Sequence, residues 1–573
     1  MDAGKVLISD IFNGANLLEI PFYQRAYVWK DEQWSRFLED MEYVTECKKQ
    51  YFLGSVILKN GESPHPWDGY SAKKIVIDGQ QRLTTFMIFM KVLCLKTNEM
   101  KSFNKRFRLD DDSIALKHGR NDIAAFEKVM EQETADTIEN TVPESRIISA
   151  YNYFINNINP EKVEKNTVSA LAQFVCIDLD NDEDEQQVFN TINSLGVRLT
   201  TAELLKNYFF HRDNVEEFDK NWVDVFEKDD ESKMYWDQEF ETGRIKRSLI
   251  DIFFDAYFQL FVLDPRFEVK PEDKIAYSRV DHLAKSYQDF IANYCNGDKS
   301  VILKNMSLYA KVFRETFNPE YCNIMMSAKS CVNRINVIVF GLKYSVLIPY
   351  ILYVATKVHD EEEKNKIYGI LESYIMRRLV LHLSTKNYNR IVNSFILTET
   401  CSAASLAEKL RNAEDPTNYF PDNSELLKGF NESKLYNLHS KGVIYFIESA
   451  IRPSSSGIVL HGFNGYSLEH LMPKKWENNW PACNTEEEKN NRNSKLLTLG
   501  NLAIIPQALN ASIRDSDWDT KKKGKGSDKP GLIACANGLL TLTDALSKDI
   551  WNEAEIEKRA QWLYEQAAFL WKL

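Results

Sequence analysis

The sequence has no long uncharged apolar run, and this lack excludes several classes of protein. No window approaches the roughly 18 apolar residues that a membrane-spanning helix needs. The first residues also lack the apolar core that follows a basic start in a signal peptide. The nine cysteines are scattered, with neither a CxxC pair nor zinc-ligand spacing. We therefore expect a protein that is neither secreted nor inserted in a membrane, with reduced thiols in the cytoplasm.

An excess of positive charge and a P-loop are missing as well. The formal net charge is −12, which argues against indiscriminate binding to nucleic acids, because such affinity comes largely from lysine and arginine. The pattern GxxxxGK[ST] does not occur, so a P-loop is excluded as the source of any phosphate binding. Any contact with a polyanion must be local.

What the sequence does have is enough apolar surface for more than one core. Its 573 residues are 44% hydrophobic, 12% aromatic and 27% charged, which is typical of a globular chain too long for a single core. We predict an α+β multidomain protein with an α/β domain over residues 1–210, an all-α helical middle over 211–445 and a C-terminal domain over 446–573.

Hydrophobic periodicity places the expected elements within these domains. In the first domain we predict strands over 17–20, 51–58, 74–77 and 174–179, and helices over 31–47, 81–96, 122–131, 146–158 and 202–210. In the middle we predict only helices, for example 247–261, 337–356, 361–383 and 442–451. In the last domain a junction at 453–457 precedes a strand within 495–505 and helices over 536–547 and 553–570.

A polar turn lies between the predicted strand 74–77 and the helix that follows it. It consists of Asp78, Gly79, Gln80, Gln81 and Arg82. Free N–H groups at a helix start attract anions, Gly79 lets a ligand approach the backbone, and Arg82 can form charge-assisted bonds to phosphate. The turn is thus either a phosphate site or a well-capped strand-to-helix connection.

A second candidate segment, residues 20–29, places Gln24 and Arg25 among aromatic residues. Arginine beside aromatic faces suits a nucleotide base and its phosphates. Tyrosines and tryptophans in such a run more often belong to a core, and that interpretation stays open beside the first.

Near the C-terminus an acidic residue directly precedes a histidine. Glu469 and His470 are followed by Pro473, and Asn501 and Asn510 come further on. Histidine can take a proton from water near neutral pH, and a carboxylate with a downstream polar side chain can hold a hard divalent cation against a phosphodiester. This combination predicts a one-metal nuclease that uses Mg²⁺ or Mn²⁺.

The most basic run of the chain lies shortly after Asn510. It contains Lys521, Lys522, Lys523 and Lys525, at a place where a nuclease needs contacts with DNA phosphates. The other interpretation of this run is a solvated loop.

These motifs together resemble the GmrSD-type restriction nucleases of bacterial phage defence. Residues 20–29, 78–85 and 189–205 are similar to the IPxYQRxYxW, DGQQRLTT and FxxxNxxGxxLxxxEL segments of that family's ParB/sulfiredoxin-like N-terminal module. Residues 469–473 and 500–505 are close variants of the EHIxP and GNLxLL segments of HNH (His-Me finger) nucleases. The resemblance implies a ββα-metal nuclease domain at the C-terminus and says little about the helical middle.

The resemblance also implies roles for single residues. His470 matches the general base, Glu469 the acidic metal-binding position, and Asn501 the asparagine that fixes the ββα loop and so orients the base. No histidine follows His470, so Asn510 takes the third position as a weaker metal ligand.

The DGQQR turn, with Asp78 and Arg82 as its catalytic residues, matches a motif that the family ties to NTP binding and hydrolysis, often of GTP. Gln24 and Arg25 join it in the nucleotide site that the resemblance implies.

The leading hypothesis is a nucleotide-regulated, metal-dependent endonuclease that restricts modified phage DNA. The alternative is a nucleotide-binding sensor or scaffold in phage defence with a degenerate nuclease site, which the missing third histidine favours. A nicking enzyme or an RNA-directed toxin is a further alternative, and the sequence leaves a homo-oligomer open.

Overall fold

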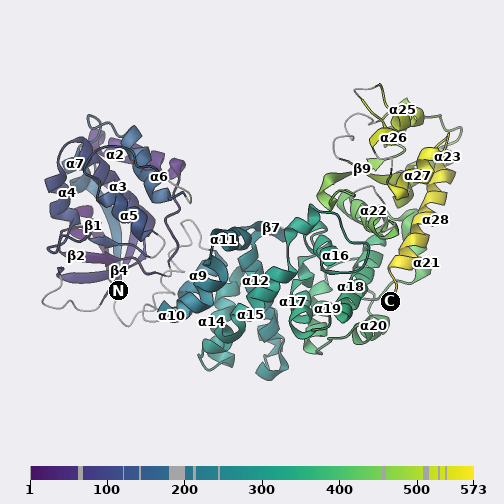
Figure 1. Cartoon of the computed structure of the whole chain (residues 1–573), viewed down its shortest axis with the longest axis horizontal. Coiled ribbons are helices and arrows are strands. Elements are labelled where there is room, and N and C mark those ends of the chain that lie inside the picture. Colours follow the sequence, from purple (N-terminus) through teal and green to yellow (C-terminus); the bar gives the residue numbers. More distant parts are fainter. Residues whose placement is uncertain are drawn as a thin grey trace. The chain divides into compact units, whose positions relative to one another are not determined.

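The chain, described by a computed structural model, divides into two compact units, residues 1–224 and 225–573 (Figure 1). The structure describes residues 2–22, 24–61, 69–119, 122–140, 144–179, 200–210, 215–242, 245–452, 460–506, 515–526, 529–535 and 538–573. The first unit therefore ends close to the boundary expected near residue 210. The helical middle and the C-terminal residues pack together as the second unit.

The first unit is built on a mixed six-stranded sheet with the strand order β1-β6-β3-β4-β2-β5. Its strands are β1 (Asp2–Leu7), β2 (Asn16–Glu19), β3 (Tyr51–Asn60), β4 (Ala72–Asp78), β5 (Leu116–Lys117) and β6 (Ala172–Leu179). The pairs β1–β6 and β3–β4 are antiparallel, and β3–β6, β2–β4 and β2–β5 are parallel. The four strands predicted from the sequence are all present, whereas β1 and β5 were not predicted.

The helices of the first unit pack largely around α3. They are α1 (Ile8–Ile11), α2 (Asp31–Cys47), α3 (Gln80–Lys96), α4 (Met100–Phe107), α5 (Ile123–Met130), α6 (Arg146–Asn157), α7 (Lys165–Leu171), α9 (Thr201–Phe209) and α10 (Val215–Phe218). Helix α3 is buried without a break from Leu83 to Leu95, although its sequence pattern predicted one buried face. It is enclosed because α4, α5, α6 and α7 all contact it.

The second unit begins with helices, as predicted. They are η2 (Asp219–Glu227, across the division), α11 (Asp230–Asp237), α12 (Leu249–Val262), η3 (Pro265–Phe267), α13 (Pro271–Tyr277), η4 (Val280–His282), α14 (Leu283–Tyr294), α15 (Ser300–Thr316), η5 (Pro319–Cys322), α16 (Val332–Asn336), η6 (Val337–Gly341), η7 (Ser345–Leu347), α17 (Ile348–Lys357), α18 (Glu361–Val380), α19 (Tyr388–Leu397), α20 (Ala403–Arg411), α21 (Asn423–Glu432) and α22 (Asn437–Ile451).

Two details of the predicted all-α middle are wrong. A β hairpin of β7 (Glu239–Thr242) and β8 (Ile245–Ser248) precedes α12, and its four-residue strands are too short to show a clear alternation. The helix predicted over 337–356 is interrupted after Gly341, and α17 begins only at Ile348 with Pro349 in its first turn. Proline is compatible with a helix start but not with a helix interior, so the break precedes it.

The C-terminal residues add a second hairpin and a long closing helix to this unit. Their elements are η8 (Phe463–Gly465), β9 (Tyr466–His470), η9 (Trp476–Asn478), α23 (Glu486–Lys495), η10 (Leu499–Asn501), β10 (Leu502–Pro506), α25 (Trp518–Lys523), α26 (Leu532–Cys535), α27 (Leu540–Ser547) and α28 (Glu553–Leu570). The predicted helix 553–570 is confirmed. Lys521, Lys522 and Lys523 form the last turn of helix α25 rather than a loop, and Lys525 follows the helix.

Buried polar contacts join the helical middle to the C-terminal elements. The carboxylate of Glu448 on α22 accepts hydrogen bonds from the backbone N–H groups of Leu540 (2.9 Å) and Thr541 (2.7 Å) at the start of α27. On α18, Arg377 donates to the carbonyl oxygen of Trp571 (2.7 Å), just after α28. Helix α28 also packs against α21 and α22. The two parts therefore share one interior.

Among the helices that the structure describes, none combines the length and the apolar character needed to cross a membrane.

Candidate active site

His470 is the last residue of β9, where the hairpin gives way to a buried turn. Strand β9 pairs antiparallel with β10, with His470 opposite Leu502 and Glu469 opposite Ala503. Residues 471–473 are buried. The side chain of His470 is thus held at the end of a strand, a more fixed position than a free loop offers.

Asn501 fixes the turn after His470. Its fully buried carboxamide accepts a hydrogen bond from the N–H of Met472 (2.8 Å) and donates to the carbonyl oxygens of Met472 (2.8 Å) and Leu496 (3.0 Å). The indole N–H of Trp551 also donates to its oxygen, over 3.1 Å. This is the arrangement that a loop-fixing asparagine requires, since both backbone groups of Met472 are held.

A buried arginine on α28 supports the segment that carries Asn501. Arg559 donates to the carbonyl oxygens of Gly500 (2.7 Å) and Leu502 (2.7 Å), and its Nε donates to that of Thr541 (3.0 Å). A Cβ atom on Gly500 would lie 2.2 Å from the carbonyl oxygen of Ile556, so only glycine permits this close approach to α28. Neither contact was predicted, because no sequence pattern links residues so far apart in the chain.

Glu469, the predicted metal ligand, is paired with Lys521 from α25. The Lys521 ammonium donates to the Glu469 carboxylate and to the carbonyl oxygen of His470 (2.6 Å), and both side chains are almost fully buried. Burial raises the pKa of Glu469, and the Lys521 ammonium opposes that rise. This pair was not predicted, because its members lie far apart along the chain.

The imidazole of His470 is held neutral. Burial lowers its pKa to about 4, and the ammonium groups of Lys474 and Lys521 contribute to the lowering. Neither ring nitrogen forms a hydrogen bond with the part of the chain that the structure describes. The imidazole is therefore unprotonated at pH 7, as a general base must be before it accepts a proton, although a pKa of about 4 makes it a weak base at that pH.

The four lysines predicted to contact DNA lie in two different environments. Lys521 and Lys522 are buried, the latter donating to the carbonyl oxygen of Lys548 (2.7 Å). Lys523 and Lys525 are exposed, and Lys523 donates to Asp519 over 3.0 Å. Only the second pair points to solvent, since α25 is a helix with one face in the interior.

Two exposed lysines, which were not predicted to contact DNA, follow the turn. Lys474 and Lys475 are exposed between the buried Pro473 and Trp476. The indole N–H of Trp476 donates to the side-chain oxygen of Asn493 (2.9 Å). The guanidinium carbon of Arg492 lies over the Trp476 ring, 4.5 Å from the ring centroid. The described residues form no ion pair with either lysine. Both lysines directly follow Pro473 in the sequence, and this proximity to His470 is the signal by which they could have been predicted.

The predicted metal site is only partly within the described residues. Asn510 lies outside them. Within them, no group of three histidine, cysteine, aspartate or glutamate side chains is arranged to hold a metal. The described residues thus supply Glu469 alone, whose charge Lys521 already balances.

The DGQQR turn of the first unit joins β4 to α3. Gly79 has a φ of +99°, and a Cβ atom there would lie 2.8 Å from Cγ2 of Val56, so the turn requires glycine. No side chain caps the N-terminus of α3 among the described residues. The first-turn N–H groups of a 17-residue helix are therefore available to an anion.

Three glutamines bind the segment 20–29 to this turn. Gln80 donates to the carbonyl oxygen of Arg25 (3.0 Å), and Gln81 accepts from the N–H of Val28 (2.8 Å). Gln24 donates to the carbonyl oxygen of Val76 (2.7 Å). The structure thus brings together the two segments predicted to form one site, and these amide side chains hold the backbone.

Charged side chains at the turn remain partly exposed. Arg82 donates to the carbonyl oxygen of Ser55 and lies 3.6 Å from the carboxylate of Asp78. Arg25 lies 3.8 Å from Glu203. A Cβ atom on Gly54 would lie 2.8 Å from Nη1 of Arg82, so Gly54 makes room for this guanidinium. A single glycine within a strand often marks a place where another group comes close to the backbone. Gly54 was therefore a sequence signal for the contact with Arg82.

Comparison with known proteins gives matches at both ends of the chain. Residues 8–210 match the N-terminal domain of GmrSD restriction endonucleases, and residues 420–566 match the C-terminal domain of the same enzymes. No curated protein matches the chain. A sheet-containing N-terminal module followed by a largely helical unit with a histidine-bearing hairpin is thus the organisation of a multidomain restriction endonuclease, an enzyme of phage defence that cuts DNA. The chain belongs to the GmrSD restriction endonuclease family.

Proposed function

We propose that this endonuclease is an HNH-type, metal-dependent enzyme whose hairpin β9–β10 and following helix form the ββα nuclease site. The observation that carries the proposal is the position of the His470 imidazole at the end of β9, with no hydrogen bond to the described residues and with the following turn held by Asn501. In this proposal His470 takes a proton from water, and the resulting hydroxide attacks a DNA phosphodiester. Asn501 positions the loop and does not touch the substrate.

The proposed metal ligands are Glu469 and Asn510. A bound Mg²⁺ or Mn²⁺ would neutralise charge at the scissile phosphate. Glu469 would have to release Lys521 to bind a cation, because the two are paired.

DNA would be held by the exposed lysines. We assign this role to Lys523 and Lys525, as predicted. We add Lys474 and Lys475, which are exposed, form no ion pair with the described residues and directly follow the His470 turn. Replacing Lys474 and Lys475 by alanine should raise KM and lower the salt slope of DNA binding by about 2. Lys558→Ala is the matched control, since Lys558 is exposed but paired with Glu555. If the Lys474/Lys475 double variant and wild type had equal salt slopes, the two lysines would not contact DNA.

The first unit is proposed to be a ParB/sulfiredoxin-like module that binds and hydrolyses an NTP, preferably GTP, and so regulates cleavage of modified phage DNA. The N–H groups at the start of α3, with Arg82 and Arg25, would bind its phosphates, and Asp78 with Arg82 would serve hydrolysis. The support is that Asp78 and Arg82 lie 3.6 Å apart in this turn and that Gln80 bonds to the backbone carbonyl of Arg25.

The decisive test is His470→Ala. We expect cleavage of modified phage DNA to fall at least about 100-fold with Mg²⁺ or Mn²⁺, because the general base is lost, while GTP binding and folding persist. His461→Ala is the control, an exposed histidine nearby in the same part of the chain. Cleavage by the His470 variant at the wild-type rate would refute the assignment.

A second candidate is a nucleotide-binding sensor or scaffold with a degenerate nuclease site. The specific observation in its favour is the Lys521–Glu469 ion pair, which occupies the predicted metal ligand. Purified wild-type protein that binds GTP and phage DNA but cuts neither plain nor modified DNA with either metal would favour this candidate.

A further inference from the structure

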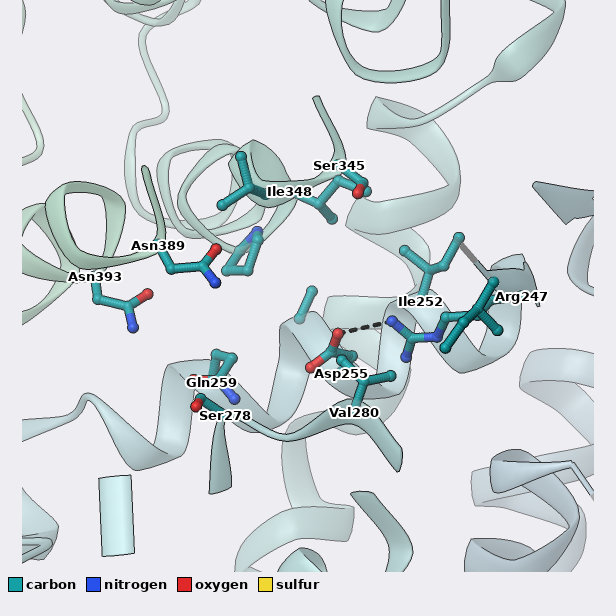
Figure 2. A pocket seen from close by; sticks show the side chains of 14 residues that line it. Arg247, Ile252, Asp255, Gln259, Ser278, Val280, Ser345, Ile348, Asn389 and Asn393 are labelled. Carbon is teal, nitrogen blue, oxygen red and sulfur yellow. Dashed lines mark hydrogen bonds and ion pairs between the residues drawn. The ribbon is translucent and has the colours of Figure 1, made fainter. Parts of the chain in front are cut away.

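A cavity of about 280 Å³ lies in the helical part of the second unit (Figure 2). Its walls come from β8, α12, η4, η7, α17 and α19, and from Ser278 just after α13. None of the residues assigned above to the nuclease or nucleotide site lines it. The cavity is therefore a separate feature of the molecule.

Several hydrogen-bonding groups that line the cavity have no partner among the described residues, and one of them, Asn389, is exposed. Asn389 and Asn393 stand one turn apart on α19, and Figure 2 shows their carboxamides turned toward the cavity. Neither carboxamide, nor the hydroxyl of Ser345, forms a hydrogen bond with the residues that the structure describes. Gln259 donates to the carbonyl oxygen of Tyr277 (3.1 Å), and its own carbonyl oxygen remains available. The cavity thus offers donors and acceptors together.

The described residues that line the cavity carry no net charge. Among them, Arg247 and Asp255 are the charged ones, and they bond to each other over 2.8 Å. The other terminal nitrogen of Arg247 donates to the carbonyl oxygen of Asp251, also over 2.8 Å. A phosphate or a cation would enter without a free counter-charge, which is costly. The ligand is therefore neutral where it lies inside.

The remaining wall is aliphatic. Ile252, Val280 and Ile348 face the space between the polar groups (Figure 2), and Pro349 also lines the cavity. A volume of about 280 Å³ lies just below the range of roughly 300–1,000 Å³ typical of ligand sites. A flat, neutral ring with donors and acceptors along one edge fits these walls, and a whole nucleoside triphosphate does not.

We propose that this cavity binds a nucleobase, with the carboxamides of Asn389 and Asn393 pairing with its hydrogen-bonding edge. Asparagine pairs in this way with adenine, giving and accepting one hydrogen bond each. The base belongs either to a free nucleoside or to a DNA strand from which it has been extruded. The second source rests on the proposed function, whereas binding in the cavity does not.

The test measures nucleoside binding to the full-length protein. Deoxyadenosine, deoxyguanosine, deoxycytidine and thymidine are titrated by calorimetry into wild-type protein and into an Asn389→Ala/Asn393→Ala variant. We expect at least one nucleoside, deoxyadenosine first, to bind with a Kd below 1 mM and to bind at least tenfold more weakly to the variant. Since neither asparagine side chain bonds to the described residues, the variant should unfold at the wild-type temperature.

Two controls separate the possible outcomes. Arg390→Ala changes an exposed residue of α19 that does not line the cavity, and should leave nucleoside binding unchanged. A single-stranded oligonucleotide distinguishes the sources: a weakened affinity in the asparagine variant indicates a base within a strand, and an unchanged affinity indicates a free nucleoside. His470→Ala should bind nucleosides normally, so failure of the nuclease assignment leaves this result intact. Equal nucleoside binding by wild type and the asparagine variant, or no binding to either, would overturn the proposal.

Discussion

The carboxamide of Asn501 satisfies four buried groups at once, which makes it the residue on which the His470 turn most depends. Alanine there would leave the N–H and carbonyl groups of Met472, the carbonyl of Leu496 and the indole N–H of Trp551 without their partner. Each such loss costs about 1–3 kcal/mol. We expect Asn501→Ala to lower the free energy of unfolding by at least about 3 kcal/mol.

Chemical denaturation of wild type and variant measures this difference. Asn479→Ala is the control, since Asn479 is exposed and donates one hydrogen bond, to Asp515 over 2.8 Å. Similar losses for the two variants would contradict the role given to Asn501.

A second expectation at the scale of single residues concerns pH. Burial lowers the pKa of His118 in the folded protein to about 3, below its usual value near 6.5. Between these values the unfolded state binds the extra proton, so the stability that neutral His118 allows is complete above pH 6.5 and is lost as pH falls. Asp122 acts in the opposite sense, because burial raises its pKa to about 6. Comparing wild type with His118→Gln separates the contribution of the histidine from that of Asp122, which both proteins contain.

We expect the stability of wild type relative to His118→Gln to fall by about 1.4 kcal/mol per pH unit between pH 6 and pH 4. Urea unfolding of both proteins at three pH values gives this difference. A difference that does not change with pH would show that His118 is protonated equally in the folded and unfolded states.

Single residues also show what the sequence was able to predict about the site. His470 and Asn501 were selected from short local motifs, and in the structure Asn501, just before β10, bonds to the turn that follows His470 on β9. The partner of Glu469 did not follow, because Lys521 lies in a different element and ordinary surface lysine runs look the same. Ion pairs between distant elements are set by packing, which one sequence does not display.

At the scale of elements, strand β3 controls the reach of Arg82. Gly54 has a φ of +106°, and a Cβ atom there would lie 2.8 Å from Nη1 of Arg82. Alanine would strain the strand and displace the guanidinium. We expect Gly54→Ala, like Arg82→Ala, to weaken GTP binding about tenfold, the loss of roughly one charge-assisted hydrogen bond.

Gly4→Ala on β1 is the matched control, since no heavy atom lies within 4 Å of the added Cβ. Nucleotide affinities from fluorescence titration compare the three variants. Normal GTP binding by the Gly54 and Arg82 variants would place the phosphate site elsewhere.

Elements were predictable where they were long and strongly periodic. Helices α2 and α28 begin and end where the sequence pattern put them. The hairpin β7–β8 and the break before α17 were missed, since short strands and a proline at a helix start leave little trace in periodicity. Helix α25 was taken for a possible loop because three consecutive lysines, Lys521 to Lys523, look solvated, although two of them are buried.

At the scale of the whole molecule, the shared interior of the second unit predicts which fragments can fold. Residues 215–573 retain the contacts of Glu448 with α27 and of Arg377 with Trp571. Residues 446–573 lose the second contact and all packing of α28 against α21. We expect the longer fragment to unfold cooperatively and the shorter one to lack a cooperative transition, as measured by circular dichroism and calorimetry.

The fragment 215–573 starts before η2, so Phe226 keeps its ring contacts with Trp236 and Phe253. A sharp thermal transition in residues 446–573 alone would show that the C-terminal part is an independent domain, as the sequence first suggested.

Lys521 neutralises the buried charge of Glu469, so the hairpin needs no metal ion to balance that carboxylate. Small metal-dependent domains commonly unfold when a chelator removes the ion that neutralises their ligands. Here a lysine supplies that neutralising charge from within the chain, so EDTA should leave the melting temperature unchanged even where it stops DNA cleavage. Stability of the hairpin would then depend on the ion pair, whereas DNA cleavage would depend on the metal. Protein that has lost its metal would regain activity when the ion is added, without refolding.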